Sequence, residues 1–226
     1  MKNIYTTFFL FFFLAIFSQA PRGFYLTGGI NNSTLKTDYF NTDSEFGYNA
    51  GIVFSFGSNE SYNLQVDFLY TQRINSFEGT SSKDNIDMNN INTEKYTAEG
   101  LEIGFYGNYY ILKPDEDKFF VGPQIGLNCN IFEGFEKKDY SDGNPTEYLL
   151  PYNISDTELK FSKINVCSAI GLTGGYNRFK FDLRYNLGLS NVFSNLQVIG
   201  FDDYIYPEGK LSDISLNISF LLFHGK

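Results

Sequence analysis

The stretch that decides the fold is "ISLNISFLL", residues 214–222, close to the end of the chain. Every second residue of this stretch is large and apolar, and the residues between them begin with Ser215 and Asn217. A period of two residues is typical of a β-strand with one apolar and one polar face. Only four residues follow Leu222 in this sequence, so we expect another kind of cover for the apolar face.

Composition points to strands as well. The 226 residues include 25 Phe, 17 Tyr and 21 Gly, which favours strands and tight turns over helices. The formal net charge of −9 and the lack of a basic run argue against nucleic acid as a partner.

The first twenty residues have the features of a signal peptide. "MKN" supplies a positive charge, and "IYTTFFLFFFLAIF" is an apolar run that is too short to span a bilayer. "SQA" follows, and we expect cleavage after Ser18 or after Ala20, with Pro21 disfavouring the second site. The sequence therefore predicts an exported chain whose single domain covers residues 21–226.

The same alternation recurs along the whole exported chain and predicts eight strands. Apart from the stretch quoted above, they lie at Gly23–Asn31, Phe46–Phe56, Tyr62–Arg73, Ala98–Ile111, Lys118–Ile131, Leu159–Gly174 and Phe179–Val192. Pro123 falls within the fifth strand, where we expect a local bulge, because proline cannot donate a hydrogen bond to a ladder.

The links between these strands alternate between short and long. Short links such as "GSNES" and "GGYNR" alternate with long polar ones, of which the longest are residues 74–97 and 133–158. This pattern predicts an all-β fold: an eight-stranded antiparallel up-and-down transmembrane β-barrel with short periplasmic turns and longer outer loops. The last strand would pair with the first, and lipid would cover its apolar face.

A soluble lipocalin-like barrel would have the same strand count, with its apolar face turned inward around a ligand. The polar face of the predicted strands is rich in Gly, Ser and Asn, whereas the other face carries bulky Phe, Leu, Ile and Tyr. Bulky residues are easier to place outside a narrow barrel than inside it, so the pattern favours the membrane barrel.

Six charged residues fall on the predicted inward face: Asp67, Arg73, Glu102, Lys180, Asp182 and Arg184. Enclosed charges need partners, because unpaired burial is costly. They could form an ion-pair network that plugs the lumen or line an ion path, and the narrow interior of an eight-stranded barrel favours the plug. We expect Arg184 to pair across the barrel with Asp67 or Glu102; the sequence leaves both open.

Residues suited to catalysis or metal binding are scarce. The single histidine, His224, follows the last predicted strand, so no Ser-His or Asp-His pair is expected at the outer rim. The oxygen-rich segments "DNIDMNN" (84–90) and "DYSDGN" (139–144) lack the EF-hand pattern. We therefore expect neither an enzyme nor a metal or other cofactor.

The two cysteines, in an exported chain, raise the question of a disulfide. Counting along the strands places Cys129 on the lipid face and Cys167 on the lumen face. Side chains on opposite faces cannot reach each other with disulfide geometry, so we expect no bond between them.

Several stretches resemble the PorT-like type of small outer-membrane β-barrel proteins. They are "RYNLGLSN" (184–191), "LQVDFLYTQR" (64–73), "LEIGFYGNYY" (101–110) and "VGPQIGL" (121–127), and the resemblance extends over residues 23–223. It implies a place in the outer membrane, with lipid and the barrel-assembly machinery as partners. A structural or interaction role, an accessory role with secretion or gliding proteins, and a small solute channel remain open as functions.

Overall fold

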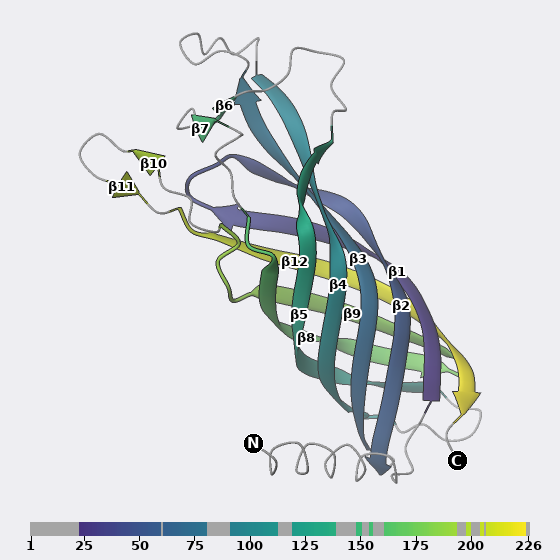
Figure 1. Cartoon of the computed structure of the whole chain (residues 1–226). Coiled ribbons are helices and arrows are strands. Elements are labelled where there is room, and N and C mark those ends of the chain that lie inside the picture. Colours follow the sequence, from purple (N-terminus) through teal and green to yellow (C-terminus); the bar gives the residue numbers. More distant parts are fainter. Residues whose placement is uncertain are drawn as a thin grey trace, which may run out of the picture.

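The computed structural model is an eight-stranded antiparallel barrel (Figure 1). It describes residues 23–59, 61–80, 91–112, 119–138, 148–150, 154–155, 161–193, 198–199, 204–205 and 207–224, so the predicted signal peptide lies outside the described residues. The long strands are β1 (Gly23–Thr37), β2 (Thr42–Asn59), β3 (Tyr62–Thr80), β4 (Ile91–Tyr109), β5 (Phe119–Lys138), β8 (Ile164–Tyr176), β9 (Phe179–Gly188) and β12 (Gly209–His224). Four two-residue strands lie in the links: β6 (Tyr148–Leu149), β7 (Ile154–Ser155), β10 (Val198–Ile199) and β11 (Tyr204–Ile205).

The sheet closes on itself. The order of the long strands is β2-β1-β12-β9-β8-β5-β4-β3, and an additional β2–β3 ladder joins the two ends. β12 pairs with β1 from His224 opposite Gly23 to Gly209 opposite Thr37. The predicted pairing of the last strand with the first is therefore confirmed, and closure leaves no open edge at membrane depth.

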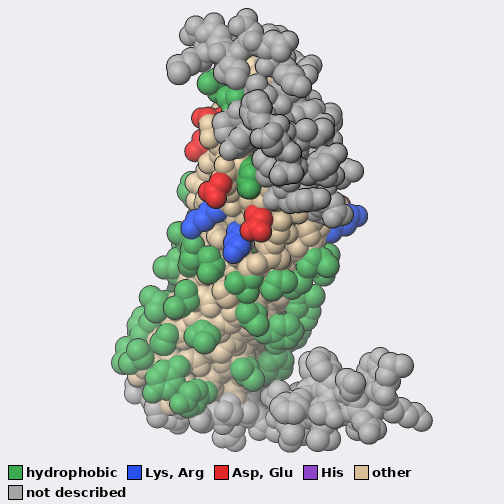
Figure 2. All heavy atoms as spheres, turned by 90° about the vertical axis from the view of Figure 1, so that its left-hand side faces the viewer, with side chains coloured by type: hydrophobic (Ala, Val, Ile, Leu, Met, Phe, Trp, Pro, Cys, Tyr) green, Lys and Arg blue, Asp and Glu red, His purple; other side chains and the backbone are tan. Residues whose placement is uncertain are grey.

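Side chains alternate between the two faces of the wall over most of its height. Along β9 every second side chain, beginning with Phe179, is exposed, and those between, beginning with Lys180, are buried. The large exposed apolar residues form a band around the lower barrel, and charged side chains appear above this band on the face shown in Figure 2. The apolar face points outward, so the membrane barrel is confirmed and the soluble alternative is wrong.

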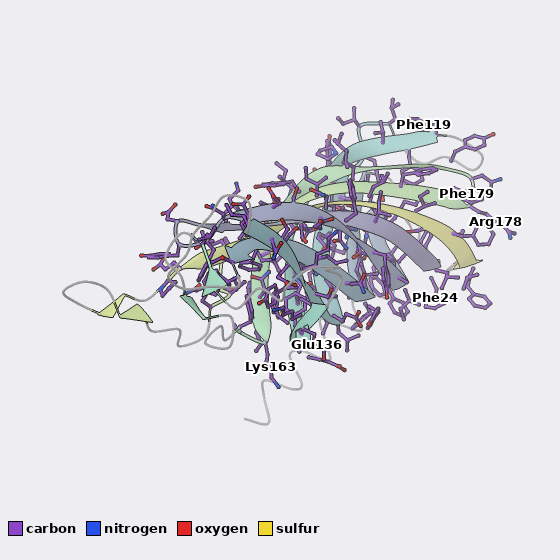
Figure 3. All side chains as sticks on the ribbon, turned by 90° about the horizontal axis from the view of Figure 1, so that it is seen from above. Phe24, Phe119, Glu136, Lys163, Arg178 and Phe179 are labelled. Atoms are coloured by element: carbon purple, nitrogen blue, oxygen red, sulfur yellow. The ribbon has the colours of Figure 1, made fainter. Side chains whose placement is uncertain are left out.

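The two ends of the barrel differ. We call the end that holds Gly23 and His224 the terminal end, and the opposite end, with β6, β7, β10 and β11, the loop end (Figure 1). Figure 3 shows Phe24, Phe119 and Phe179 at the terminal end with their rings pointing away from the barrel. Such rings are typical of the aromatic girdle at a membrane interface. No helix in the described part of the chain has the length and apolar character needed to cross a membrane.

The wall extends further at the loop end than the sequence predicts. β3 and β4 stay paired as far as Thr80 opposite Ile91, although residues 74–97 were expected to be a loop. The reason is a reversed pattern: Phe77 and Tyr96 are buried inside, while Lys95 lies outside. Above the apolar band, water instead of lipid surrounds the barrel. A search of the sequence for strands with an apolar outer face therefore does not detect these strand ends.

The predicted bulge at Pro123 is absent from the β5–β8 ladder, which runs from Phe119 to Ile131 without a shift. On the other edge, the β4–β5 ladder ends at the Asn108–Gln124 pair, and an isolated bridge joins Leu112 to Val121. Between the Asn108–Gln124 pair and this bridge, the chain on the β4 side contains one residue more than β5. The alternation along β5 therefore continues through Pro123.

The two thiols offer a test of this alternation. Cys129 lies half-buried on the outer face, Cys167 is fully buried in the lumen, and both are free. We expect a lipophilic maleimide to label Cys129 in the folded, detergent-solubilised protein and to leave Cys167 unmodified, with both labelled after denaturation without reductant. Mass spectrometry of tryptic peptides measures this. Labelling of Cys167 in the folded protein, or two blocked thiols in the denatured chain, would contradict the assignment.

Candidate functional site

The lumen is the candidate functional site, because it gathers the charged residues of the wall. All six residues predicted to face inward are at most 3% exposed: Asp67, Arg73, Glu102, Lys180, Asp182 and Arg184. They come from β3, β4 and β9, and their contacts centre on two arginines at different depths.

Arg184 on β9 forms the centre nearer the terminal end. Its Nη1 donates to Oδ2 of Asp67 at 2.7 Å, and its Nη2 donates to Oδ2 of Asp182 at 3.1 Å. The guanidinium carbon lies 3.9 Å from the centre of the Tyr106 ring. Of the two acceptors that the sequence left open, the structure pairs Arg184 with Asp67.

Arg73 on β3 forms the second centre. Its Nη2 donates to Oε2 of Glu102 at 2.8 Å, its Nε donates to Oδ2 of Asp213 at 3.0 Å, and its Nη1 donates to Oδ1 of Asn130 at 2.8 Å. Sequence reasoning missed Asp213. The signal was present, because the polar face of β12 that holds Ser215 extends by alternation to residue 213.

Lys180 lies beside the Arg184 centre. Its Nζ is 3.3 Å from Oδ2 of Asp182, donates to Oε1 of Gln65 at 2.6 Å, and lies 5.3 Å from the centre of the Tyr25 ring. Gln65 also donates from its Nε2 to Asp67 at 2.8 Å. The side-chain amide of Gln65 thus accepts a hydrogen bond from Lys180 and donates one to Asp67. Both charged groups therefore have a hydrogen-bond partner although they are buried.

Neutral side chains join the two centres into one network. Asn186 donates to Oδ1 of Asp213 at 2.7 Å and accepts from Asn128 at 2.9 Å. The Tyr106 hydroxyl donates to Oε1 of Glu102 at 3.3 Å while the same ring lies against Arg184. Tyr106 therefore joins the two centres, by a hydrogen bond on the Arg73 side and by its ring face on the Arg184 side. We call the buried charged residues and these neutral partners the polar network: Asp67, Arg73, Glu102, Lys180, Asp182, Arg184, Asp213, Gln65, Tyr106, Asn128, Asn130 and Asn186.

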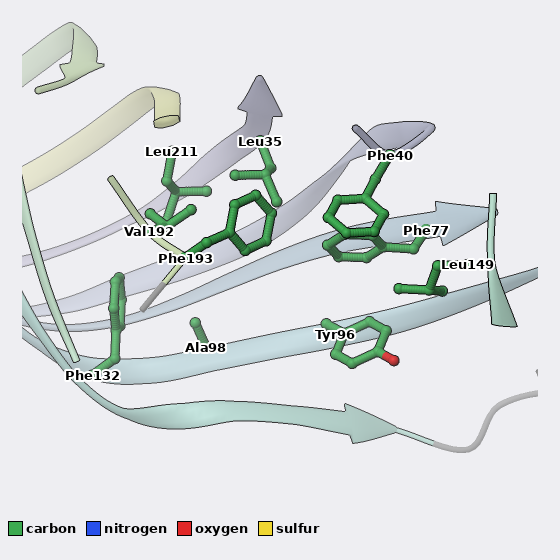
Figure 4. Close-up of a cluster of buried hydrophobic side chains, with 10 residues drawn as sticks. All are labelled: Leu35, Phe40, Phe77, Tyr96, Ala98, Phe132, Leu149, Val192, Phe193 and Leu211. Carbon is green, nitrogen blue, oxygen red and sulfur yellow. The ribbon is translucent and has the colours of Figure 1, made fainter. Parts of the chain in front are cut away.

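Aromatic and apolar side chains are buried in the lumen on both sides of the polar network. At the terminal end, Tyr25, Tyr110 and Phe120 are at most 5% exposed, and the Tyr110 and Phe120 rings meet edge to face at 5.2 Å. At the loop end lies a larger buried cluster, which we call the aromatic cap (Figure 4): Leu35, Phe40, Phe77, Tyr96, Ala98, Phe132, Leu149, Val192, Phe193 and Leu211.

The border between the polar network and the aromatic cap is sharp. On the inward face of β3, Arg73 belongs to the network and Phe77 to the cap, and Asn75 lies between them with no exposed surface. Neither side-chain atom of Asn75 has a hydrogen-bond partner among the described residues. Above Arg73 the Phe132 ring lies 5.8 Å from the guanidinium carbon, so an aromatic face covers the top of the network.

Charged side chains reappear outside the wall, above the apolar band. Lys95 on β4 lies 2.8 Å from Glu45 on β2, and this ammonium holds the pKa of the Glu45 carboxyl below its usual value. The pair is partly exposed and contributes little to stability. The pair instead marks the height at which the outer face of the wall is no longer in contact with lipid.

The described residues offer little for catalysis. They contain no group of three or more His, Cys, Asp or Glu side chains that could hold a metal ion. The backbone of His224 ends β12 at the terminal end, so the residue belongs to the last strand instead of following it. The oxygen-rich segments 84–90 and 139–144 lie outside the described residues.

Comparisons with known proteins agree with this architecture. A family model described as "Outer membrane protein beta-barrel domain" matches residues 17–194, well over half of the chain. No curated protein sequence matches.

Three solved structures are similar in outline. Ail, the attachment invasion locus protein of Yersinia pestis, is 16% identical with a TM-score of 0.44, and the match covers 88% of this chain and 98% of Ail. OprG of Pseudomonas aeruginosa is 10% identical (TM-score 0.42; 89% and 94% covered), and Neisserial surface protein A is 12% identical (TM-score 0.39; 90% and 100% covered). On the strength of the family match and the closed barrel, this chain belongs to the outer membrane protein beta-barrel domain family and resides in the outer membrane.

Proposed function

We propose that this protein is a non-enzymatic barrel with a sealed lumen, which serves a structural or interaction role in the outer membrane. The observation that supports the proposal is the filling of the lumen in three layers: rings at the terminal end, the polar network in the middle and the aromatic cap at the loop end. An ion that crossed the barrel would have to displace all three.

The polar network favours a plug over an ion path. Its four carboxylates and three cationic groups are almost fully buried, and each cationic group lies within 3.3 Å of a carboxylate oxygen. Charges held this closely are not free to exchange with a passing ion, and the interior of an eight-stranded barrel is only wide enough for its own side chains. We infer that the charges stabilise one arrangement of the strands.

The test of the sealed lumen is electrical. We expect the purified protein in planar bilayers to give no stable single-channel steps in potassium chloride, because the three layers leave no aqueous path. A general porin in the same bilayer is the positive control. Large, stable and reproducible steps would overturn the proposal in favour of a small solute channel.

Removal of Arg184 should lower stability without preventing membrane insertion. Arg184→Ala leaves Asp67 and Asp182 without their shortest cationic contacts, at an expected cost of about 3–5 kcal/mol. The lipid face is unchanged, so the variant should still insert. The measurement is the temperature at which the heat-modifiable band is lost on a gel, and it should fall.

Arg178→Ala is the matched control, because Arg178 is exposed in the β8–β9 turn, where Figure 3 shows it at the terminal end. This variant should melt with the parent protein. If Arg184→Ala is as heat-resistant as the parent, the network does not carry stability and this part of the proposal fails.

An accessory role in a secretion or gliding apparatus is the second candidate. It is favoured by the PorT-like stretch "RYNLGLSN" (184–191), which begins on β9 at Arg184 and extends beyond the end of that strand. Crosslinking in intact cells, followed by isolation of the tagged barrel, separates the candidates. Reproducible co-isolation of a secretion complex would favour the accessory role, and recovery of the barrel with lipid alone would count against it.

A further inference from the structure

The charges of the polar network are balanced around Arg184. The two carboxylates at this centre belong to Asp67 and Asp182, and Arg184 contacts both of them. Lys180 adds a second cation, with its Nζ 3.3 Å from Oδ2 of Asp182. Two positive and two negative groups leave this centre without net charge.

The charges around Arg73 are not balanced. Oε2 of Glu102 lies 2.8 Å from Nη2 of Arg73, and Oδ2 of Asp213 lies 3.0 Å from the same nitrogen. Two carboxyl groups therefore share one guanidinium. If both were ionised, this centre would carry one negative charge in excess.

The rest of the described lumen offers no charge to offset this excess. Arg73, Lys180 and Arg184 are the only cationic side chains in the described part of the chain that are at most 3% exposed. Within that part, β1, β2 and β5 contribute no buried charged side chain. The other buried charged or titratable groups of the lumen around the Arg73 centre are Asp67, Tyr106, Cys167, Lys180, Asp182 and Arg184. An unbalanced carboxylate in such a place is costly and instead takes up a proton.

A chain of directional hydrogen bonds shows that Asp213 is the ionised carboxyl group. Arg73 can only donate, so its bond to Oδ1 of Asn130 fixes the orientation of that amide. Asn130 donates to Asn128 at 3.0 Å, and Asn128 donates to Asn186 at 2.9 Å. Asn186 then donates to Oδ1 of Asp213 at 2.7 Å, while Oδ2 accepts from Nε of Arg73. Both oxygens of Asp213 face donors, which leaves no acceptor for a proton there.

Glu102 has an oxygen that can hold a proton. Its Oε2 faces Arg73, but its Oε1 faces the hydroxyl of Tyr106 at 3.3 Å. This contact is longer than the roughly 2.8 Å that is usual between two oxygens, so an ionised Oε1 gains little from it. A hydroxyl can accept as well as donate, and the hydrogen bond can therefore run from Glu102 to Tyr106.

We propose that the Arg73 centre is a proton-binding site, in which Glu102 holds a proton on Oε1 at neutral pH and donates it to the Tyr106 hydroxyl. Asp213 stays ionised against Arg73, and the polar network then has no net charge. The proton comes from water as the barrel folds, so the site needs no path through the lumen. A sealed lumen requires no particular protonation state, so the inference goes beyond the proposed function.

Amide substitutions of the two carboxyl groups should have opposite effects. Glu102→Gln reproduces the protonated state, because its oxygen accepts from Arg73 while its amide donates to Tyr106. This variant should lose its heat-modifiable band at the temperature of the parent or above it. Asp213→Asn is the matched variant on the same guanidinium. It turns an amide donor toward Arg73 or Asn186, which both already donate, so it should melt below the parent.

Proton uptake on folding also gives heat resistance a pH dependence. A glutamate in the unfolded chain is ionised above about pH 5, whereas the folded barrel keeps the proton on Glu102. Where the folded state binds one proton more, the equilibrium constant of unfolding rises about tenfold per pH unit. The temperature at which the parent loses its heat-modifiable band should therefore fall between about pH 6 and about pH 8, and it should fall less in Glu102→Gln.

Infrared absorption detects the proton directly. At neutral pH, in a detergent without carbonyl groups, solvated carboxyl groups are ionised, and a protonated one absorbs apart from them. We expect a carboxylic-acid band in the parent and its loss in Glu102→Gln. Glu136→Gln is the matched control and should keep the band, because Glu136 is exposed on β5, where Figure 3 shows its side chain away from the barrel.

Three results would overturn the proposal. The first is a parent spectrum without a carboxylic-acid band that Glu102→Gln removes. The second is a Glu102→Gln variant that fails to fold or that melts as far below the parent as Asp213→Asn does. The third is heat resistance of the parent that depends on potassium in place of choline, because a bound cation would then supply the missing charge.

Discussion

The ladder between β1 and β12 is the interaction on which the rest of the structure depends, because a sheet in lipid has no other way to satisfy its edge. Each unpaired amide or carbonyl at membrane depth costs several kcal/mol, on the order of 2–7. Closure satisfies them all, but it also encloses the polar face of every strand in one narrow lumen. Lys180, Asp182 and Arg184 therefore share a space from which water is excluded, and they have to find partners among themselves and their neighbours.

Lipid and water impose opposite demands at two levels of the same wall. Within the apolar band, the outer surface faces lipid and the lumen holds the polar network. Above the band, the outer surface faces water and the lumen holds the aromatic cap. The reversal falls between Arg73 and Phe77 on β3, and Asn75 lies at the point of change with both side-chain atoms unpartnered among the described residues.

Sequence reasoning reached the strand number, the closure and the facing of the charged residues, because all three follow from a period of two residues within the apolar band. It chose no partner for Arg184, because Asp67 and Glu102 both face inward. In the structure Asp67 pairs with Arg184, and Glu102 pairs with Arg73. It missed the upper ends of β3, β4 and β5, where the pattern reverses and polar residues outside look like a loop.

The charges inside the barrel have a consequence for the register of the strands. A slip by one residue in any ladder would turn a whole strand inside out, and a wall that was apolar on both faces would tolerate such a slip. Here a slip of β9 would move Lys180, Asp182 and Arg184 into lipid and bring Phe181 and Leu183 into the lumen. The ion pairs need not add net stability over an apolar filling of the same shape. Their effect is to disfavour registers that are shifted by one residue, so the residues that we propose to seal the lumen would also help to select the register in which β1 and β12 meet.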